Sequence, residues 1–214
     1  MLKHIKIKGS EIASILAATL VIALVISLIE TTQIFLYTFL IIFLIILINF
    51  FGKKLSAYYY DTEIKVKLWE LKRYWFRAHD HFHRPFPMGI IFPIITSALT
   101  LGLVNWMACL TFDVKKPVYK AARRHDRTDY NFSEVTEWQI GIIATWGLAA
   151  NLIAALIAIK LGYPEFAKLN IYFMFYNIIP FSDLDGTKIF FVNRTVWSIS
   201  VIIILAATII ATMA

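Results

Sequence analysis

Four apolar runs, each about as long as a bilayer is thick, constrain this chain more than any other feature. They cover residues 12–29, 34–51, 138–159 and 195–213. A helix needs roughly 20 such residues to cross the hydrocarbon core of a membrane. The composition agrees, because 59% of the 214 residues are apolar and 16% are charged, whereas soluble domains are nearer about one half and one quarter. We therefore expect an all-α, polytopic integral membrane protein in contact with the lipid bilayer.

Basic residues gather between the apolar runs and predict how the chain is oriented. Residues 53–84 hold eight of the 21 Lys and Arg, and residues 115–127 hold six more. Loops rich in Lys and Arg stay on the cytoplasmic side, so we expect loops 53–84 and 113–136 in the cytoplasm of a protein of the cell membrane. Attraction to anionic lipid explains the net charge of +7, and nucleic acid is not needed as a partner.

The apolar run 88–112 lies between these loops and is broken by Pro93, Gly102 and Asn105. If both loops are cytoplasmic, the run must leave and return on the same side, as a re-entrant segment or short hairpin. The alternative is a full span that puts one basic loop outside. Residues 63–69 alternate polar and apolar, which predicts a small interfacial strand with one wet face.

The stretch 177–186 interrupts an apolar run with a proline and two acids. Pro180 removes a backbone donor and clashes with the preceding turn, so the helix must open just before it. Asp183, Asp185 and Gly186 follow at once, and apolar sequence then resumes. Acids at membrane depth are candidates for function, because lipid tolerates them only where protein or water shields them. The alternative is a polar break at a helix end, where both acids simply reach the interface.

The spacing Asn-x-x-Pro-x-x-x-Leu-Asp-Gly resembles the second signature of the site-2 protease family of intramembrane zinc metallopeptidases. The resemblance implies that Asp185 stands at a zinc-ligand position and that residues 177–180 form an unwound edge near a substrate. It also implies a site-2-protease-like core over residues 34–192, between an N-terminal transmembrane helix (1–33) and a C-terminal transmembrane anchor (193–214). The matching positions are Asn177, Pro180, Leu184, Asp185 and Gly186.

A second stretch, residues 147–151, resembles the Gly-Pro-x-x-Asn element of the same family, with Leu148 in place of the proline. Asn151 puts an amide in the middle of an apolar span, where it needs a hydrogen-bond partner. We expect it to bond the opened backbone near Pro180 or a bound substrate segment. The candidate substrate-binding residues are therefore Asn151, Asn177, Pro180 and Gly186.

The first signature of that family, His-Glu-x-x-His, is missing from the second apolar run, which contains no histidine. Residues 49–53 stand in its place, with Asn49 and Lys53 where the two imidazoles belong and Phe50 where the general base belongs. Phenylalanine cannot act as a base, and an ammonium repels zinc. We therefore expect Lys53 to pair with Asp185, in place of a link through a metal.

A histidine-rich stretch could be mistaken for the missing signature. Residues 79–83 read His-Asp-His-Phe-His, but they lie in a polar, Arg-rich segment and on no apolar helix. An interfacial segment is the plain interpretation, and an adventitious or regulatory metal site formed by His79, His81 and His83 is the alternative. The single cysteine, Cys109, excludes an intramolecular disulfide and a cysteine-based metal site.

Three functional interpretations follow. The first is a non-proteolytic relative, with no expected cofactor, that binds transmembrane helices of other proteins or unwound segments. The second is a working metallopeptidase whose zinc is held by Asp185 and by unusual or partner-supplied ligands. The third is a small transporter or structural membrane protein in which Asp183 and Asp185 mark a proton or cation path.

Overall fold

The computed structural model describes residues 8–27, 31–73, 81–115 and 136–213. Helices make up most of these residues, and short strands, turns and loops make up the rest. In chain order the elements are α1 (Gly9–Ile26), α2 (Thr32–Tyr59), β1 (Glu63–Leu68), β2 (Leu71–Arg73), β3 (His81–Phe86), α3 (Met88–Leu99), β4 (Leu110–Lys115), α5 (Glu137–Lys160), α6 (Pro164–Ile178), α7 (Asp185–Val192) and α8 (Arg194–Met213).

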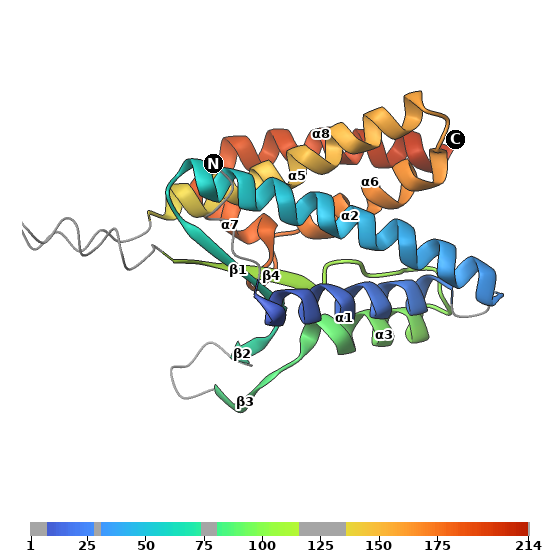
Figure 1. Cartoon of the computed structure of the whole chain (residues 1–214), viewed down its shortest axis with the longest axis horizontal. Coiled ribbons are helices and arrows are strands. Elements are labelled where there is room, and N and C mark those ends of the chain that lie inside the picture. Colours follow the sequence, from blue (N-terminus) through green and yellow to red (C-terminus); the bar gives the residue numbers. More distant parts are fainter. Residues whose placement is uncertain (1–7, 28–30, 74–80, 116–135, 214) are drawn as a thin grey trace, which may run out of the picture.

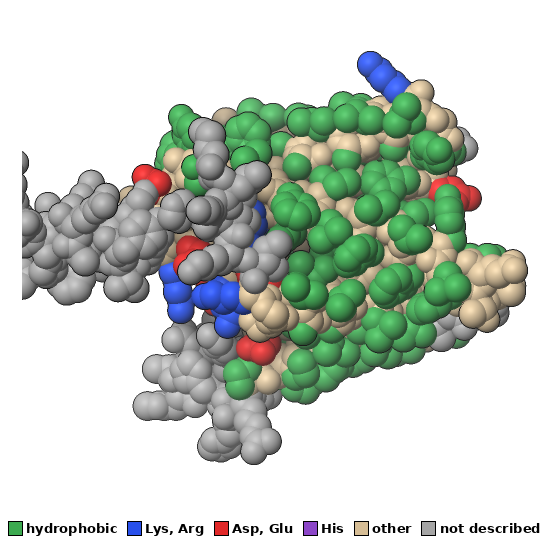
Figure 2. All heavy atoms as spheres, viewed as in Figure 1, with side chains coloured by type: hydrophobic (Ala, Val, Ile, Leu, Met, Phe, Trp, Pro, Cys, Tyr) green, Lys and Arg blue, Asp and Glu red, His purple; other side chains and the backbone are tan. Residues whose placement is uncertain are grey.

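Four helices within the described residues, α1, α2, α5 and α8, are long and apolar enough to cross a membrane. They run roughly along the long axis of the molecule in Figure 1. Figure 2 shows apolar side chains over most of the visible face, with many of the charged side chains gathered at the end where the strands lie. The expectation of a membrane protein is supported at this level. The sidedness of its loops stays a prediction.

Proline and small polar residues set the helix boundaries around the central bundle. Thr136 caps α5, because its side chain accepts a hydrogen bond from the backbone N–H of Gln139, whose own side chain bonds back to Thr136. α6 begins at Pro164, where the missing N–H has no partner to lose. It ends at Ile178, two residues before Pro180, as the sequence predicts.

The strands form two small antiparallel sheets. β1 pairs with β4 in a register that puts Val66 opposite Phe112, and β2 pairs with β3. The strand expected at residues 63–69 is therefore present. Its partner β4 lies at the end of the broken apolar run, for which no strand was expected.

The broken run folds as a hairpin whose two ends lie together. α3 carries Pro93 within its 12 residues, and the chain then turns and returns to β4 (Figure 1). Trp69 joins the two ends through its backbone. Its backbone N–H donates to the Cys109 carbonyl, and its carbonyl accepts from the N–H of Gly89, each at 2.8 Å. A side chain at Gly89 would collide with the Cys109 carbonyl. The run thus leaves and returns at one end of the molecule, and its insertion into a bilayer stays a prediction.

An aromatic cluster ties this hairpin to the segment between α6 and α7. Trp69 packs against Phe92 of α3 at 6.0 Å between ring centroids and against Phe181 at 5.6 Å. Its indole N–H also donates to the Ser182 hydroxyl. On the outside of the bundle, α1 contacts α2 and β1, while α8 contacts α6 and α7. The division of the chain at residues 33 and 192 stays a prediction.

Candidate functional site

A buried ion pair joins Lys53 of α2 to Asp185 at the start of α7. The Lys53 Nζ lies 2.5 Å from Asp185 Oδ2, and the two side chains are 6% and 0% exposed. The expected pairing of these residues is thus confirmed, although they are 132 positions apart in the sequence. The position of Lys53 as the last residue of the degenerate signature was the signal that found it.

Glycines on α2 and α5 make room for this pair. A Cβ on Gly147 would lie 2.7 Å from Lys53 Cε and 3.2 Å from Asn49 Nδ2. Asn49, one turn before Lys53, therefore shares its helix face and is itself buried. Gly52 packs against the backbone of α5 near Trp146. These small residues let α2 and α5 approach closely, and they seat Asn49 and Lys53 against α5.

The break after α6 turns Asp185 into the bundle. Ser182 has a φ of 52°, in the left-handed region, and Gly186 has no side chain to collide with the Ile178 carbonyl. Asp185 is the first residue of α7, where the helix dipole favours a negative charge. The sequence around Pro180 therefore does two things, since it ends one helix and begins another with a buried carboxylate.

The opened backbone is less available than the sequence suggested. The Ile178 carbonyl accepts a hydrogen bond from the Trp197 indole of α8 at 3.0 Å, and the Ile179 carbonyl accepts one from the N–H of Phe181. Asn177 is buried and donates to the Phe173 carbonyl of its own helix. Pro180 is exposed.

Asn151 does not bond the backbone near Pro180, so that alternative was wrong, while a bond to a bound substrate segment stays a prediction. Its side chain is fully buried, and neither of its polar atoms has a hydrogen-bond partner among the described residues. Only its backbone carbonyl is used, by the side chain of Asn170 at 3.1 Å. Asn151 lies where α5 packs against α6. The Ile178 and Ile179 carbonyls of the opened segment already accept hydrogen bonds from Trp197 and Phe181.

A second lysine, Lys188 of α7, was missed by the sequence analysis. Its Nζ donates to the Thr111 hydroxyl at 2.7 Å, the Phe112 carbonyl at 2.8 Å and the Asp183 carbonyl at 3.0 Å. It also pairs with the Asp183 carboxylate at 3.3 Å. Burial lowers the pKa of Lys188, and the nearby acids oppose that shift. The Phe112 ring lies 4.2 Å from this ammonium and 4.9 Å from that of Lys53.

The site is short of hydrogen bonds. Neither oxygen of Asp185 accepts one from a described residue, so the contact with Lys53 is an ion pair without hydrogen-bond geometry. Asn49 Nδ2 and Thr187 Oγ1 also lack partners within the described part of the chain. Buried polar groups without partners are rare in proteins and each calls for an explanation, such as a role in binding or a missing water.

These residues do not fit a zinc ion. Zinc prefers nitrogen, sulfur and carboxylate ligands, and the group that meets Asp185 is an ammonium, which repels a cation. Across the described residues there is no group of three His, Cys, Asp or Glu placed to hold a metal. Phe50, at the expected base position, is buried and can take no proton. His79 and the side chains of His81 and His83 lie outside the described residues.

A further buried pair, between Glu11 of α1 and Lys54 of α2, was also missed. Lys54 Nζ lies 3.1 Å from Glu11 Oε1 and donates to the Ile64 carbonyl. Glu11 in turn accepts hydrogen bonds from the N–H groups of Val66 and Lys8. A lone acid near the start of an apolar run was the only signal for this pair.

No protein-family model, curated protein or solved structure matches this chain. The resemblance to the site-2 proteases therefore depends on the motif positions and on the placement of Lys53 beside Asp185.

Proposed function

We propose that this chain is a non-proteolytic relative of the site-2 proteases that binds a membrane helix or an unwound segment of another protein. The observation that carries the proposal is the buried Lys53–Asp185 ion pair. It occupies the place where the resemblance puts the metal and its ligands. One ammonium supplies positive charge to Asp185 without a metal, so the carboxylate keeps its position while the hydrolytic chemistry is lost.

The residues present argue against peptide hydrolysis. A catalytic zinc needs about three protein ligands and an open position for water. Hydrolysis also needs a general base within hydrogen-bond reach of that water. Asp185 offers one ligand, Lys53 repels a cation, and Phe50 offers no base. The carbonyls of the opened segment at Ile178 and Ile179 are already hydrogen-bonded, so the neighbouring strand is the part that suits binding.

The outer edge of β4 is the surface that supports a binding role. On β1, the Val66 N–H bonds Glu11 and the Ile64 carbonyl accepts from Lys54, so both point away from β4. Phe112 and Val114 lie opposite Val66 and Ile64 on β4, so their backbone N–H and C=O groups must point away from β1 in the same way. The Phe112 carbonyl does so and meets Lys188.

This edge leaves backbone groups free. Phe112 is buried and Lys188 takes its carbonyl, whereas the outward groups of the partly exposed Val114 have no bond to a described residue. An unpaired strand edge can add an extended segment of another chain. Asp183, Asp185 and Lys188 lie at the same end of the molecule as this edge. An unwound membrane segment, whose own N–H and C=O groups need partners, is a suitable guest.

The first test measures the chemistry. We expect the protein purified in detergent to hold well under one zinc per chain and to leave candidate transmembrane substrates intact. The matched control is the Asp185→Ala variant, which should behave in the same way in both assays. Cleavage that is abolished both by a chelator and by Asp185→Ala would establish a working metallopeptidase and overturn the proposal.

The second test measures the binding of a guest segment to the outer edge of β4. Val114→Pro removes the outward N–H of β4 without touching its bonds to β1, whereas Val114→Ala keeps the N–H. Binding of a synthetic membrane helix with a central Asn-Pro break, measured by energy transfer in liposomes, should fall at least about tenfold for Val114→Pro only. Equal binding by both variants would exclude strand addition. A response of the protein to a pH or ion gradient instead of a guest would favour the transporter interpretation.

A further inference from the structure

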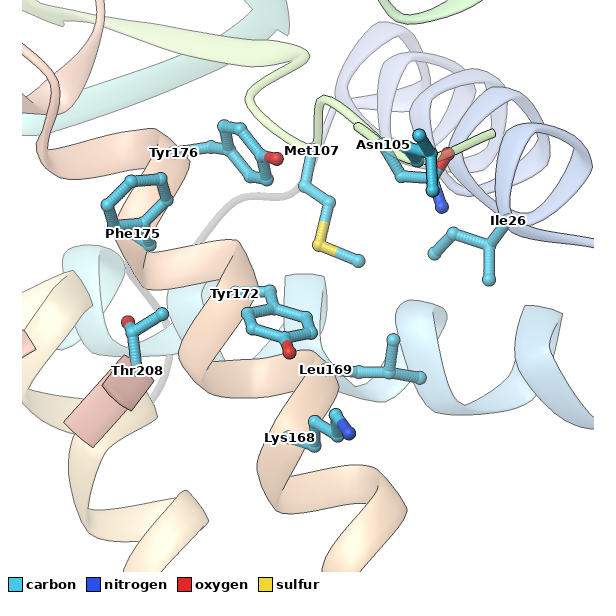
Figure 3. Close-up of a pocket in the computed structure, with 10 residues that line it drawn as sticks. Ile26, Asn105, Met107, Lys168, Leu169, Tyr172, Phe175, Tyr176 and Thr208 are labelled. Atoms are coloured by element: carbon cyan, nitrogen blue, oxygen red, sulfur yellow. The ribbon is translucent and has the colours of Figure 1, made fainter. Parts of the chain in front are cut away.

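A cavity of about 480 Å³ lies between the return chain of the hairpin and α6, away from the Lys53–Asp185 pair. Its walls come from four separate parts of the chain, namely the end of α1, residues 103–107, α6 and α8. Figure 3 shows Met107 reaching from the return chain toward Tyr172 of α6. Cavities of this size hold a small molecule. A helix with its side chains is about 10 Å wide, so only about one helical turn would fit.

Lys168 stands at one end of this cavity. It lies one turn after the start of α6 at Pro164, at the end of the molecule opposite to the strands. Its side chain is exposed, and no described residue forms an ion pair with it. In a membrane protein this is the depth at which lysine reaches the phosphates of the lipid headgroups.

Asn105 gives a second and independent indication of a ligand. Its Oδ1 is buried and has no hydrogen-bond partner among the described residues, and the residue lines the same cavity as Lys168. An amide oxygen in this position can accept a hydrogen bond from an N–H or O–H group of a ligand. A cation and an unused acceptor in one cavity are complementary to a group that carries both a phosphate and a hydrogen-bond donor.

The remainder of the cavity is suited to an acyl chain. It extends along α6 from Lys168 to Tyr176, eight residues or about 12 Å of helix. Ile26, Met107 and Leu169 supply apolar wall along this length. The cavity thus has a polar end at the depth of the headgroups and an apolar length directed toward the middle of the bundle.

We infer that this cavity binds one phospholipid whose headgroup carries a donor, such as phosphatidylethanolamine. The phosphate contacts Lys168, the headgroup ammonium donates to Asn105 Oδ1, and one acyl chain lies between Met107 and Tyr172. This site is separate from β4 and from Asp185, so it does not depend on the proposed function. Its loss should leave the binding of a guest at β4 unchanged.

The test uses native mass spectrometry of the purified protein with added lipids that share the same acyl chains. We expect one phosphatidylethanolamine to remain bound per chain, with phosphatidylcholine, which lacks a donor, about fivefold weaker. Lys168→Glu should weaken binding about tenfold. The matched control is Lys160→Glu, a charge reversal at the same end of the molecule that does not line the cavity, and it should change little.

Photolabelling locates the lipid. A phosphatidylethanolamine with a diazirine in its acyl chain should label Met107 and Tyr172, and Thr208→Trp, which fills the cavity from α8, should remove that label. Equal lipid retention by the Lys168 and Lys160 variants, or labels spread evenly over the outer helices, would show ordinary surrounding lipid only. Displacement of the label by a synthetic membrane helix would assign the cavity to a protein guest. Either result overturns the proposal.

Discussion

Two consecutive lysines of α2 form two buried ion pairs that are built in opposite ways. Lys54 meets Glu11, and the backbone groups of Val66 and Ile64 complete the hydrogen bonds of both charges. Lys53 meets Asp185, whose oxygens accept no hydrogen bond from a described residue. Burial is nearly complete in both pairs, so the solvent does not explain the difference.

The difference separates a structural pair from a candidate site. A buried pair is well tolerated when hydrogen bonds satisfy both ions, and the Glu11–Lys54 pair fastens α1, α2 and β1 together in this way. The Lys53–Asp185 pair leaves polar capacity unused in the middle of a membrane bundle. Proteins commonly accept such a cost at sites that bind something else.

The largest effect should come from introducing zinc ligands in place of Asn49 and Lys53, opposite Asp185. The double change Asn49→His with Lys53→His places two imidazoles one turn apart, opposite Asp185. We expect about one zinc per chain with micromolar or tighter affinity, which corresponds to about 8 kcal/mol. Zinc titration of the purified variant measures this.

The control for that experiment is the same double change with Asp185→Ala, which should bind zinc at least about tenfold more weakly. Zinc binding that is equally tight without Asp185 would mean that the third ligand is elsewhere. The resemblance to the metallopeptidase geometry would then be accidental.

The next effect comes from breaking each pair by one substitution. Glu11→Ala removes the carboxylate that pairs with the buried Lys54 ammonium and the acceptor of the Val66 N–H, and it should cost about 3–5 kcal/mol of unfolding free energy. Asp185→Ala should cost clearly less, because it also removes two unsatisfied oxygens. Unfolding in mixed detergent micelles compares them, with Asp113→Ala in the half-exposed Lys67–Asp113 pair as a control below about 1 kcal/mol. Equal losses at Glu11 and Asp185 would remove the distinction between the pairs.

Replacing both members of a pair with apolar residues should increase the difference in stability effect between the two pairs. Lys53→Met with Asp185→Leu is expected to be neutral or to stabilise the protein by roughly 1–4 kcal/mol. Lys54→Met with Glu11→Leu should instead destabilise it by about 2 kcal/mol, because the backbone groups of Ile64 and Val66 lose their partners. The same unfolding assay measures both, and a gain in stability from the second variant would contradict this account.

The smallest effect is expected at Asn151, whose amide has no partner for either polar atom among the described residues. Asn151→Leu should raise the free energy of unfolding by about 1 kcal/mol, because it removes a buried polar group without a partner. Asn177→Leu is the control and should lower it, since that side chain donates to Phe173. A loss of stability at Asn151 would reveal a partner, and a loss of guest binding alone would place Asn151 in the binding site.

The sequence predicted those features that depend on local patterns. Apolar runs located α1, α2, α5 and α8, alternation located β1, and Pro180 located the end of α6. The pairing of Lys53 with Asp185 was also predictable, because the two family signatures put both residues at the metal site although they are far apart in the sequence.

The features that the sequence missed depend on the position of a strand. Nothing in the apolar run before Lys115 predicted β4, and Lys188 finds two of its hydrogen-bond partners, Thr111 and Phe112, only because β4 passes beside α7. Glu11 and Lys54 likewise meet through β1. The opened backbone is not the partner of Asn151, and Trp197, on a helix treated as a plain anchor, bonds the Ile178 carbonyl there instead.

The adjacency of Lys53 and Lys54 has a mechanical consequence for α2. Side chains of consecutive helical residues point about 100° apart, so the two ion pairs hold this helix from two directions at the same level. A rotation of α2 about its own axis would stretch one pair while compressing the other. Any rearrangement that opens the Asp185 site must therefore come from a shift of α7 or of the segment before it, while α2 does not rotate about its axis.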